Sequence, residues 1–161
     1  MNFRTTELCD RHADLQRLTI AEPLFRSFGG HSHCQGPITT VKVFEDDVLI
    51  RAILAETNPG GILVVDGGGS HRCALIDGAL ARSAAENGWQ GLVVYGCIRD
   101  TLELSKIPMA VLALHAHPLR AHARGTGERD VLITFASVNF RTGHFLYADA
   151  DGLVVCESPL V

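Results

Sequence analysis

The stretch ILVVDGGGS, residues 62–70, decides the fold of this chain. Its first four residues form a continuous apolar run, which is typical of a strand buried on both faces. Its glycine-rich end, Asp66–Ser70, predicts a tight turn. A second apolar run, LVVY at residues 92–95, follows a segment with helical spacing at residues 78–87. Together these segments predict a β-α-β unit whose two strands are parallel and joined by a right-handed crossover.

Shorter elements are predicted on both sides of this unit. They are helices at 5–9, 46–55 and 101–105, and strands at 38–43, 110–114, 131–135, 138–140 and 153–156. The last three strands alternate with turn signals at Thr142-Gly143 and Asp151-Gly152, which predicts an antiparallel layer. We therefore expect an α/β fold in which residues 1–161 form one domain, with a β-α-β core joined to an antiparallel C-terminal layer.

Composition excludes several classes of protein. Of the 161 residues, 47% are hydrophobic and 20% are charged, so a packed core is expected. The net charge of -4, without a basic run, argues against direct nucleic-acid binding. Five cysteines without a Cys-x-x-Cys pair argue against a disulfide framework or a structural zinc site. No leader-type stretch begins the chain and no run approaches about 20 apolar residues, so we expect a cytoplasmic protein without a membrane partner.

The pair Arg99-Asp100 follows the second buried strand, where open α/β sheets place ligand sites. A carboxylate there can bind a hard cation such as Mg²⁺, and the guanidinium can bond a carboxylate or a developing enolate. This combination suits a 2-oxo acid, because a chelating cation makes C3 a better electron sink when the C3–C4 bond breaks. The alternative is an ordinary surface ion pair between the two side chains.

Two nearby features could complete such a site. If a helix starts near Gly78, the first N–H groups of the helix are free, and residues Asp77, Gly78, Ala79 and Leu80 offer an anion site. The alternative is an Asp77 N-cap without a ligand. Glu103 lies one helical turn after Asp100 and could position a water molecule, or it could be a solvated helix residue.

Three other motifs carry less chemistry. The Gly67–Gly69 turn lacks the spacing of a nucleotide-binding loop. The pairs His31/His33 and His115/His117 lack a zinc pattern, so we interpret them as surface or loop histidines. Residues 149–152 (DADG) begin like a calcium loop but lack its remaining ligands, which favours a hairpin turn.

Several segments together resemble one known family over nearly the whole chain, from Glu7 to Pro159. They are FGG at 28–30, VKVFED at 41–46, VVDGGGS at 64–70, GCIRD at 96–100, GTGE at 125–128 and YAD at 147–149. On these motifs the chain is similar to the RraA-like family. That family contains regulators of ribonuclease E activity and divalent-metal 4-hydroxy-4-methyl-2-oxoglutarate aldolases.

The resemblance implies an α/β/β sandwich of the swivelling phosphohistidine-domain type, assembled as a homotrimer or a dimer of trimers. It also implies a class II aldolase, using Mg²⁺ or Mn²⁺, that cleaves 4-hydroxy-4-methyl-2-oxoglutarate to two pyruvates and has secondary oxaloacetate decarboxylase activity. Asp100 matches the family's metal ligand and Arg99 its substrate-binding arginine. Residues Asp77 to Leu80 match the helix start that binds substrate.

The chain departs from the family pattern at one position. Many catalytic members carry a carboxylate there, separated from the Arg-Asp pair by twenty residues. Here that position is Gly78, as in some members, and the aspartate is its neighbour Asp77. Regulator-type members lack the carboxylate that this chain retains as Asp100. The chain therefore keeps the metal ligand while lacking one water-positioning carboxylate, which would be consistent with weak aldolase activity. The alternative function is that of a protein regulator that binds ribonuclease E and inhibits RNA processing.

Overall fold

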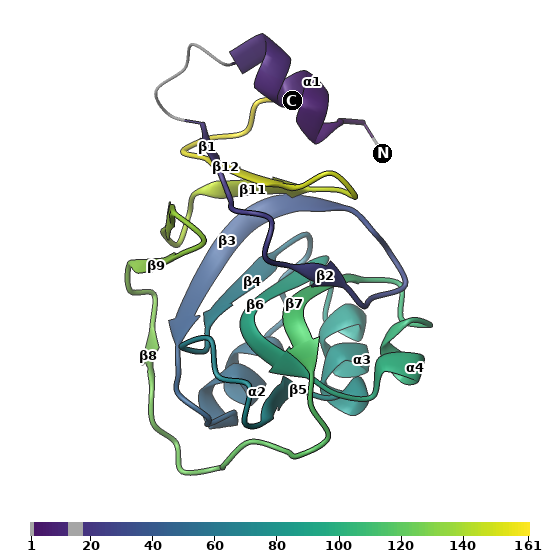
Figure 1. Cartoon of the computed structure of the whole chain (residues 1–161), viewed down its shortest axis with the longest axis vertical. Coiled ribbons are helices and arrows are strands. Elements are labelled where there is room, and N and C mark those ends of the chain that lie inside the picture. Colours follow the sequence, from purple (N-terminus) through teal and green to yellow (C-terminus); the bar gives the residue numbers. More distant parts are fainter. Residues whose placement is uncertain (1, 13–17) are drawn as a thin grey trace.

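The computed structural model describes residues 2–12 and 18–161, and Figure 1 shows the arrangement of their helices and strands. The helices are α1 (Thr5–His12), α2 (Val48–Leu54), α3 (Gly78–Glu86) and α4 (Thr101–Leu104). The strands are β1 (Thr19–Ile20), β2 (Arg26–Ser27), β3 (Cys34–Lys42), β4 (Ile62–Asp66), β5 (Ala74–Ile76), β6 (Gly91–Ile98), β7 (Ala110–Ala116), β8 (Glu128–Arg129), β9 (Ile133–Phe135), β10 (Val138–Phe140), β11 (Phe145–Ala148) and β12 (Leu153–Cys156).

The predicted β-α-β unit is confirmed. Strands β4 and β6 pair in parallel, with Leu63 opposite Leu92, and α3 lies between them in the chain. Both apolar runs are buried because each of their faces packs against a separate core. Leu63 and Val65 contribute to the core beneath the helices, whereas Val64 contributes to the core on the opposite face.

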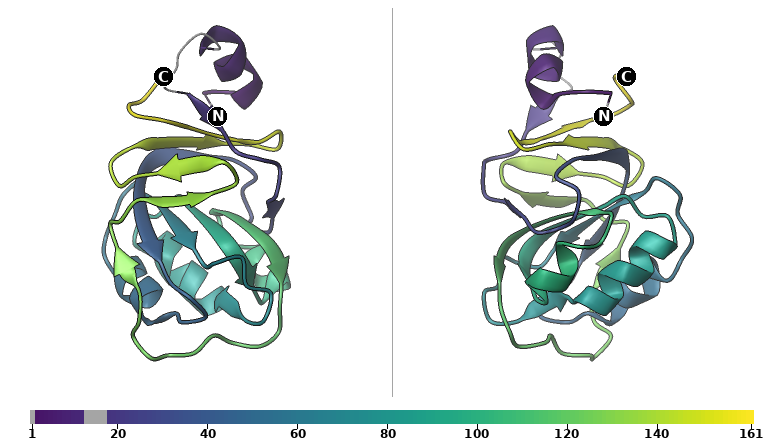
Figure 2. Two further views of the ribbon diagram at one scale, coloured as in Figure 1. Left: turned by 60° about the vertical axis from the view of Figure 1, so that its left-hand side comes forward. Right: turned by 90° about the vertical axis from the view of Figure 1, so that its right-hand side faces the viewer.

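The parallel strands form the centre of a larger mixed sheet. Strands β3, β4, β6 and β7 are parallel neighbours, and the flanking pairs with β11, β8 and β2 are antiparallel. Helices α2, α3 and α4 lie on one face of the parallel strands, and the C-terminal hairpins cover the other (Figure 2). The fold is thus the expected mixed α/β class, while its assignment to the swivelling phosphohistidine-domain type stays a prediction.

Strand β3 connects the two parts of this architecture. Its first residues, Cys34 to Pro37, pair with β11, and its last residues, Ile38 to Lys42, pair with β4. The sequence pattern predicts a strand only from Ile38, because Gly36 and Pro37 are poor strand residues. The strand continues through them since the change of neighbour from β11 to β4 occurs at this proline.

The antiparallel C-terminal layer is confirmed and contains one strand more than expected. Strands β9 and β10 form a hairpin, and β11, which was not predicted, pairs with both β12 and β3. The DADG segment forms the turn between β11 and β12, as expected for a hairpin. Its first residue, Asp149, accepts hydrogen bonds from the backbone amide and the hydroxyl of Thr5, at 2.7 and 2.6 Å, and so attaches α1 to the sheet.

Four further strands, β1, β2, β5 and β8, were not predicted either; each has only two or three residues. The five cysteines all have free thiols, as expected. Within residues 2–12 and 18–161, no helix has the length and apolar character needed to cross a membrane.

Candidate functional site

The ends of three parallel strands bring the predicted site residues to one edge of the sheet. Strand β5 pairs with the end of β6, and β7 pairs with its other side, so all three end at the same edge. The Arg99 amide donates to the Ile76 carbonyl at 2.9 Å, which fixes Arg99 next to the start of α3. Figure 1 shows α1 and both termini at the opposite end of the molecule from α2 and β5.

The backbone conformation of Asp100 directs its carboxylate toward α3. Asp100 has φ 62° and ψ 46°, a left-handed conformation that aspartate adopts more readily than most residues. It precedes α4 without capping that helix through its side chain. Its Oδ2 instead accepts a hydrogen bond from the Gly78 amide at 2.9 Å, which is the first amide of α3.

Asp77 is the N-cap of α3, which is one of the two possibilities that the sequence left open for this residue. Its Oδ1 accepts from the Leu80 amide at 2.8 Å. Its Oδ2 lies 3.1 Å from Nη2 of Arg51 and 4.0 Å from Nη2 of Arg99. Burial opposes ionisation of Asp77, but the Leu80 amide and the two guanidinium groups outweigh it and lower the pKa of this carboxyl.

We expected the first backbone amides of α3 to be free. This is wrong for two of the first three amides. Asp100 occupies the Gly78 amide and Asp77 occupies the Leu80 amide. The physical reason is that helix starts are rarely left without acceptors, and this one has two carboxylates within reach. The Leu80 side chain packs in the core beneath the helices, while Ala79 is exposed.

Arg51 joins the starts of α2 and α3, and no sequence motif pointed to it. One Nη2 atom donates to Asp47 at 3.0 Å and to Asp77 at 3.1 Å. The Asp47 side chain is 3% exposed, and its Oδ1 has no hydrogen-bond partner among the described residues. Arg51 therefore compensates a buried charge on one side and orients Asp77 on the other.

The predicted surface ion pair between Arg99 and Asp100 does not occur in the described part of the chain. Arg99 turns instead toward Asp77, and its Nη1 donates to the Pro118 carbonyl at 3.4 Å. The two side chains line one pocket of about 240 Å³, together with Thr101, Ala116, His117 and Pro118. Arg99 and Asp100 thus line a common space while their side chains bond to different partners.

Glu103 lies against Gly78. A Cβ atom built on Gly78 would overlap the Glu103 carboxylate, so glycine at this position leaves the space that the carboxylate occupies. Glu103 Oε1 also pairs with Nη1 of Arg82 at 2.7 Å. The start of α3 is therefore flanked by three carboxylates, from Asp77, Asp100 and Glu103.

The residues at this site fit a divalent cation that has Asp100 as its protein ligand and takes most of its other ligands from water and substrate. Among the residues that the structure describes, no three His, Cys, Asp or Glu side chains converge as a protein metal site would require. Oδ2 of Asp100 accepts the hydrogen bond from the Gly78 amide, which leaves Oδ1 as a hard oxygen ligand. Mg²⁺ accepts such an arrangement, because it commonly binds one or two carboxylates and completes its shell with water and substrate.

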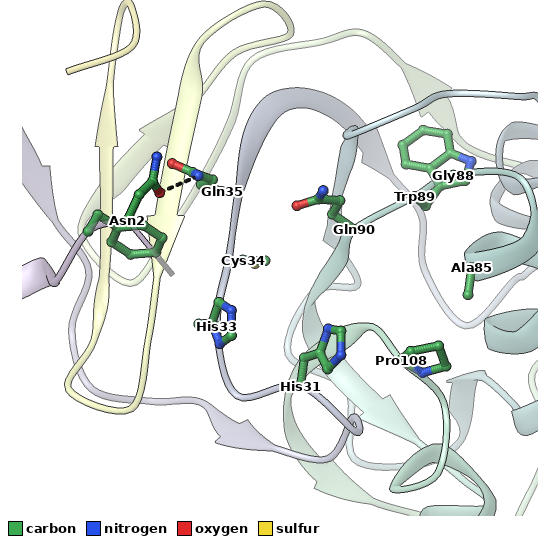
Figure 3. A pocket seen from close by; sticks show the side chains of 11 residues that line it. Asn2, His31, His33, Cys34, Gln35, Ala85, Gly88, Trp89, Gln90 and Pro108 are labelled. Atoms are coloured by element: carbon green, nitrogen blue, oxygen red, sulfur yellow. Dashed lines mark hydrogen bonds between the residues drawn. The ribbon is translucent and has the colours of Figure 1, made fainter. Parts of the chain in front are cut away.

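A larger cleft lies elsewhere and offers different chemistry. It measures about 600 Å³ and is lined by residues that include His31, His33, Gln35, Gln90 and Asn2. Figure 3 shows both imidazoles at this cleft, with the Asn2–Gln35 hydrogen bond of 2.7 Å on one side and Gln90 on the other. None of the described residues that line it carries a carboxylate or a guanidinium group, so these residues lack the charges that an oxo acid and a cation require.

The remaining motifs have structural roles. The turn at Gly67–Gly69 is confirmed: Gly68 and Gly69 have φ of 68° and 70°, and the Gly67 and Gly69 amides both donate to the Tyr95 carbonyl. Such a turn needs glycine because positive φ is costly for other residues. Among the described residues, neither histidine pair belongs to a group of three or more His, Cys, Asp or Glu side chains.

Comparison with known proteins places the chain among relatives of equal length. A family model described as RraA-like, Aldolase/RraA, matches residues 5–155. A protein of Methylococcus capsulatus, provisionally named 4-hydroxy-4-methyl-2-oxoglutarate aldolase, is 60% identical over 100% of both chains.

Two solved structures share the fold closely. The RNA-processing inhibitor RraA from Thermus thermophilis is 43% identical, with a TM-score of 0.95 over 100% of this chain and 96% of that one. A Geobacillus kaustophilus structure, described as S-adenosylmethionine:2-dimethylmenaquinone methyltransferase, is 44% identical, with a TM-score of 0.95 over 98% and 97%. Similar chains thus carry three different functional names, so the site itself must decide between them.

Proposed function

Because the chain belongs to the RraA-like family, we propose that it is a divalent-metal-dependent aldolase that cleaves 4-hydroxy-4-methyl-2-oxoglutarate to two pyruvates. Oxaloacetate decarboxylation is its secondary activity, since both reactions pass through the enolate of pyruvate. The observation that supports this proposal is the shared pocket of Arg99 and Asp100 beside the start of α3. A cation, a guanidinium and helix amides at one place are what a developing enolate needs.

Arg99 and Asp100 have separate roles in this proposal. Asp100 would hold the cation, and Mg²⁺ or Mn²⁺ would supply Lewis-acid polarisation of the 2-oxo group. Arg99 binds the 1-carboxylate and stabilises the negative charge that develops on the oxo oxygen. Asp77 keeps the guanidinium in place from 4.0 Å without occupying it in a close bidentate pair.

The start of α3 holds the substrate in the same proposal. Asp77 and Asp100 already accept from the Leu80 and Gly78 amides. The Ala79 amide lies in the first turn, where it has no acceptor within the helix, and it remains available to a substrate oxygen. Residues Asp77 to Leu80 would therefore act through one free amide and the helix dipole rather than through a row of free N–H groups.

Glu103 positions a water molecule that acts as the base. The water takes the proton of the 4-hydroxyl group and passes a proton to the Glu103 carboxylate, the C3–C4 bond breaks, and the electron pair of that bond forms the enolate through C3. The hydroxyl carbon becomes the carbonyl of one pyruvate, and protonation at C3 completes the second. The support for Glu103 is its position over Gly78, where it occupies the space that a side chain at residue 78 would take.

A coupled assay of pyruvate release tests the proposal. Purified protein with Mg²⁺ should release pyruvate from 4-hydroxy-4-methyl-2-oxoglutarate and from oxaloacetate, and EDTA should stop both reactions. The uncatalysed, metal-promoted decay of oxaloacetate is subtracted with protein-free samples. If neither substrate releases pyruvate above that background, with Mg²⁺ or with Mn²⁺, the aldolase proposal is overturned.

A second candidate function is regulation of ribonuclease E, and the 43% identity to the RNA-processing inhibitor RraA favours it. The net charge of -4 suits contact with a basic partner surface. A pull-down with ribonuclease E and an RNA cleavage assay with and without this chain would test it. No binding at micromolar concentration would count against this function.

We further propose that the protein acts in the cytoplasm as a homotrimer or a dimer of trimers. Two apolar side chains, Leu102 and Leu119, are 73% and 60% exposed in the single chain. Both adjoin residues that line the Arg99–Asp100 pocket, and contact with a second copy would cover them. Light scattering coupled to gel filtration would give the mass, and a monomer at micromolar concentration would contradict the assembly.

A further inference from the structure

The turn from His117 to Leu119 is attached on both sides to the segments that carry the site. The His117 amide donates to the Ile98 carbonyl at 2.9 Å, directly before Arg99 in the chain. The Pro118 carbonyl accepts from Nη1 of Arg99, and the Leu119 carbonyl accepts from the Ala74 amide at 2.7 Å. His117 is half-buried and lines the same pocket as Arg99 and Asp100.

A backbone hydrogen bond fixes the tautomer of the His117 ring. The Leu119 amide donates to Nδ1 of His117 at 3.1 Å. A backbone N–H can only donate, so Nδ1 must accept and carries no proton. The ring proton is therefore on Nε2, and adding a proton at Nδ1 would break the Leu119 bond. In this tautomer His117 is a hydrogen-bond donor through Nε2, with a fixed orientation.

We propose that Nε2–H of His117 binds the carboxylate remote from the oxo group, so that the site selects 2-oxo diacids over 2-oxo monoacids. This inference rests on the proposed function, in which Arg99 and the cation at Asp100 take the 1-carboxylate and the 2-oxo oxygen. The Nδ1 edge of the ring is turned to Leu119, which leaves the Nε2 edge for a ligand. The other lining residues, Thr101, Ala116 and Pro118, carry no charge.

The same hydrogen bond argues against a role for His117 as a general acid. A ring that donates from Nε2 while Nδ1 remains unprotonated would have to become an imidazolate after giving up its proton. Donation without proton transfer needs no such change, and it favours an anionic oxygen by electrostatics alone. His117 is therefore a specificity-determining residue.

The ring state can be measured without any activity assay. Long-range ¹H–¹⁵N correlation spectra of the wild-type protein should show an unprotonated Nδ1 and a protonated Nε2 for His117. Addition of 2-oxoglutarate, an unreactive 2-oxo diacid, together with Mg²⁺ should shift the Nε2 signal, whereas pyruvate should leave it nearly unchanged. A protonated Nδ1, or equal shifts with both acids, would overturn the inference.

Binding to variants tests the selectivity. His117→Ala should weaken 2-oxoglutarate binding in the presence of Mg²⁺ by about tenfold or more, as expected for one lost hydrogen bond to a charged group. Pyruvate affinity should change less than twofold. His117→Gln should retain most of the diacid affinity, because its amide nitrogen can donate from nearly the position of Nε2. His33→Gln, in the cleft of Figure 3, is the matched control and should bind both acids like the wild type.

These outcomes separate the two proposals. Equal losses for both acids in His117→Ala, or no loss for either, would overturn the role of His117 even if the wild type releases pyruvate. Selective loss for the diacid would support it even if the wild type releases none, in which case only the aldolase reaction would be wrong.

Discussion

The starts of α2 and α3 both carry ionised aspartates, but the two regions satisfy them in different ways. Asp46, before α2, is 1% exposed and accepts from the Val48 and Arg124 amides at 3.1 and 2.9 Å and from the Thr126 hydroxyl at 3.2 Å. Its hydrogen bonds come from backbone amides and a hydroxyl, and they attach the loop at residues 124–126 to α2. Asp77, before α3, pairs with guanidinium groups beside a pocket.

The difference separates a structural acid from one that belongs to a site. Hydrogen bonds from neutral groups occupy the Asp46 carboxylate, so it has no capacity left to bind a ligand. At the start of α3, by contrast, Arg99 has a long ion-pair contact with Asp77 and one hydrogen bond to the Pro118 carbonyl, and Asp100 uses one oxygen. Both groups keep capacity for a ligand, and they face one space. The site is therefore identified by two charged groups, on Arg99 and Asp100, that lie at one pocket and can still bind a ligand. The size of a cleft is a weaker guide.

The largest expected effect comes from removing the charge of Asp100. Asp100→Asn can still accept from the Gly78 amide, so the unfolding free energy should change by less than about 1 kcal/mol. Pyruvate release should fall by about 10³-fold, because a neutral amide is a poor ligand for Mg²⁺. Steady-state kinetics and urea unfolding measure the two effects. Loss of turnover below tenfold would remove Asp100 from the proposed reaction.

Asp46→Ala should show the opposite pattern. It leaves three backbone amides and a hydroxyl without their acceptor, which should lower the unfolding free energy by about 2–4 kcal/mol. Turnover per folded molecule should stay within twofold of the wild type. Urea unfolding followed by circular dichroism provides the first value. A variant as stable as the wild type would show that the loop is held by other contacts.

The pH dependence of this stability should follow the ionisation of Asp46. Burial opposes ionisation, but the amides of Val48, Thr126 and Arg124 outweigh it and lower the pKa of Asp46. A lowered pKa in the folded state means that the stabilisation is complete above the unfolded value of about 3.9 and is lost as pH falls through the folded value. The stability difference between wild type and Asp46→Ala should therefore be constant from pH 5 to 7 and shrink below about pH 4. A difference that grows on acidification would contradict this sign.

The strands differ in how far the sequence could predict them. The apolar runs in β4 and β6 are long enough to specify buried parallel strands, and Arg99-Asp100 could be located because it follows one of them. Strand β11 was missed because its four residues owe much of their strand pairing to β3, which is distant in sequence, although β12 follows it directly. Short β5 was missed for the same reason.

The charge network depends on tertiary packing in the same way. Arg51 reaches Asp77 only because α2 and α3 lie side by side on the sheet, and no local pattern contains that information. The carboxylate of Asp100 reaches α3 because of its left-handed backbone, which the sequence does not specify. His117 had one available signal: it follows β7 at the edge where Arg99 follows β6. The interpretation as a surface or loop histidine did not use it.

Arg51→Met tests the connection between the two helix starts. It leaves Asp47 as an uncompensated buried charge and removes one cation from Asp77, so Arg99 should pair more closely with Asp77. We expect a fall of about tenfold in kcat/KM, or about 1.4 kcal/mol, together with lower stability. In Arg51→Met/Asp47→Asn the stability should recover, because the buried charge is gone, while kcat/KM should not. Recovery of both would assign the whole effect of Arg51 to folding.

The smallest effect is expected from adding a methyl group at Gly78. The Cβ of Gly78→Ala would overlap the Glu103 carboxylate, which is partly exposed and can move aside. Stability should therefore change by no more than about 0.5 kcal/mol, whereas kcat should fall about threefold if that carboxylate positions the catalytic water. In a Glu103→Ala background the space is empty, and Gly78→Ala should then have no further effect on kcat. If both backgrounds lose the same factor, the methyl group acts on the substrate or on the Gly78 amide, and Glu103 is a solvated helix residue paired with Arg82.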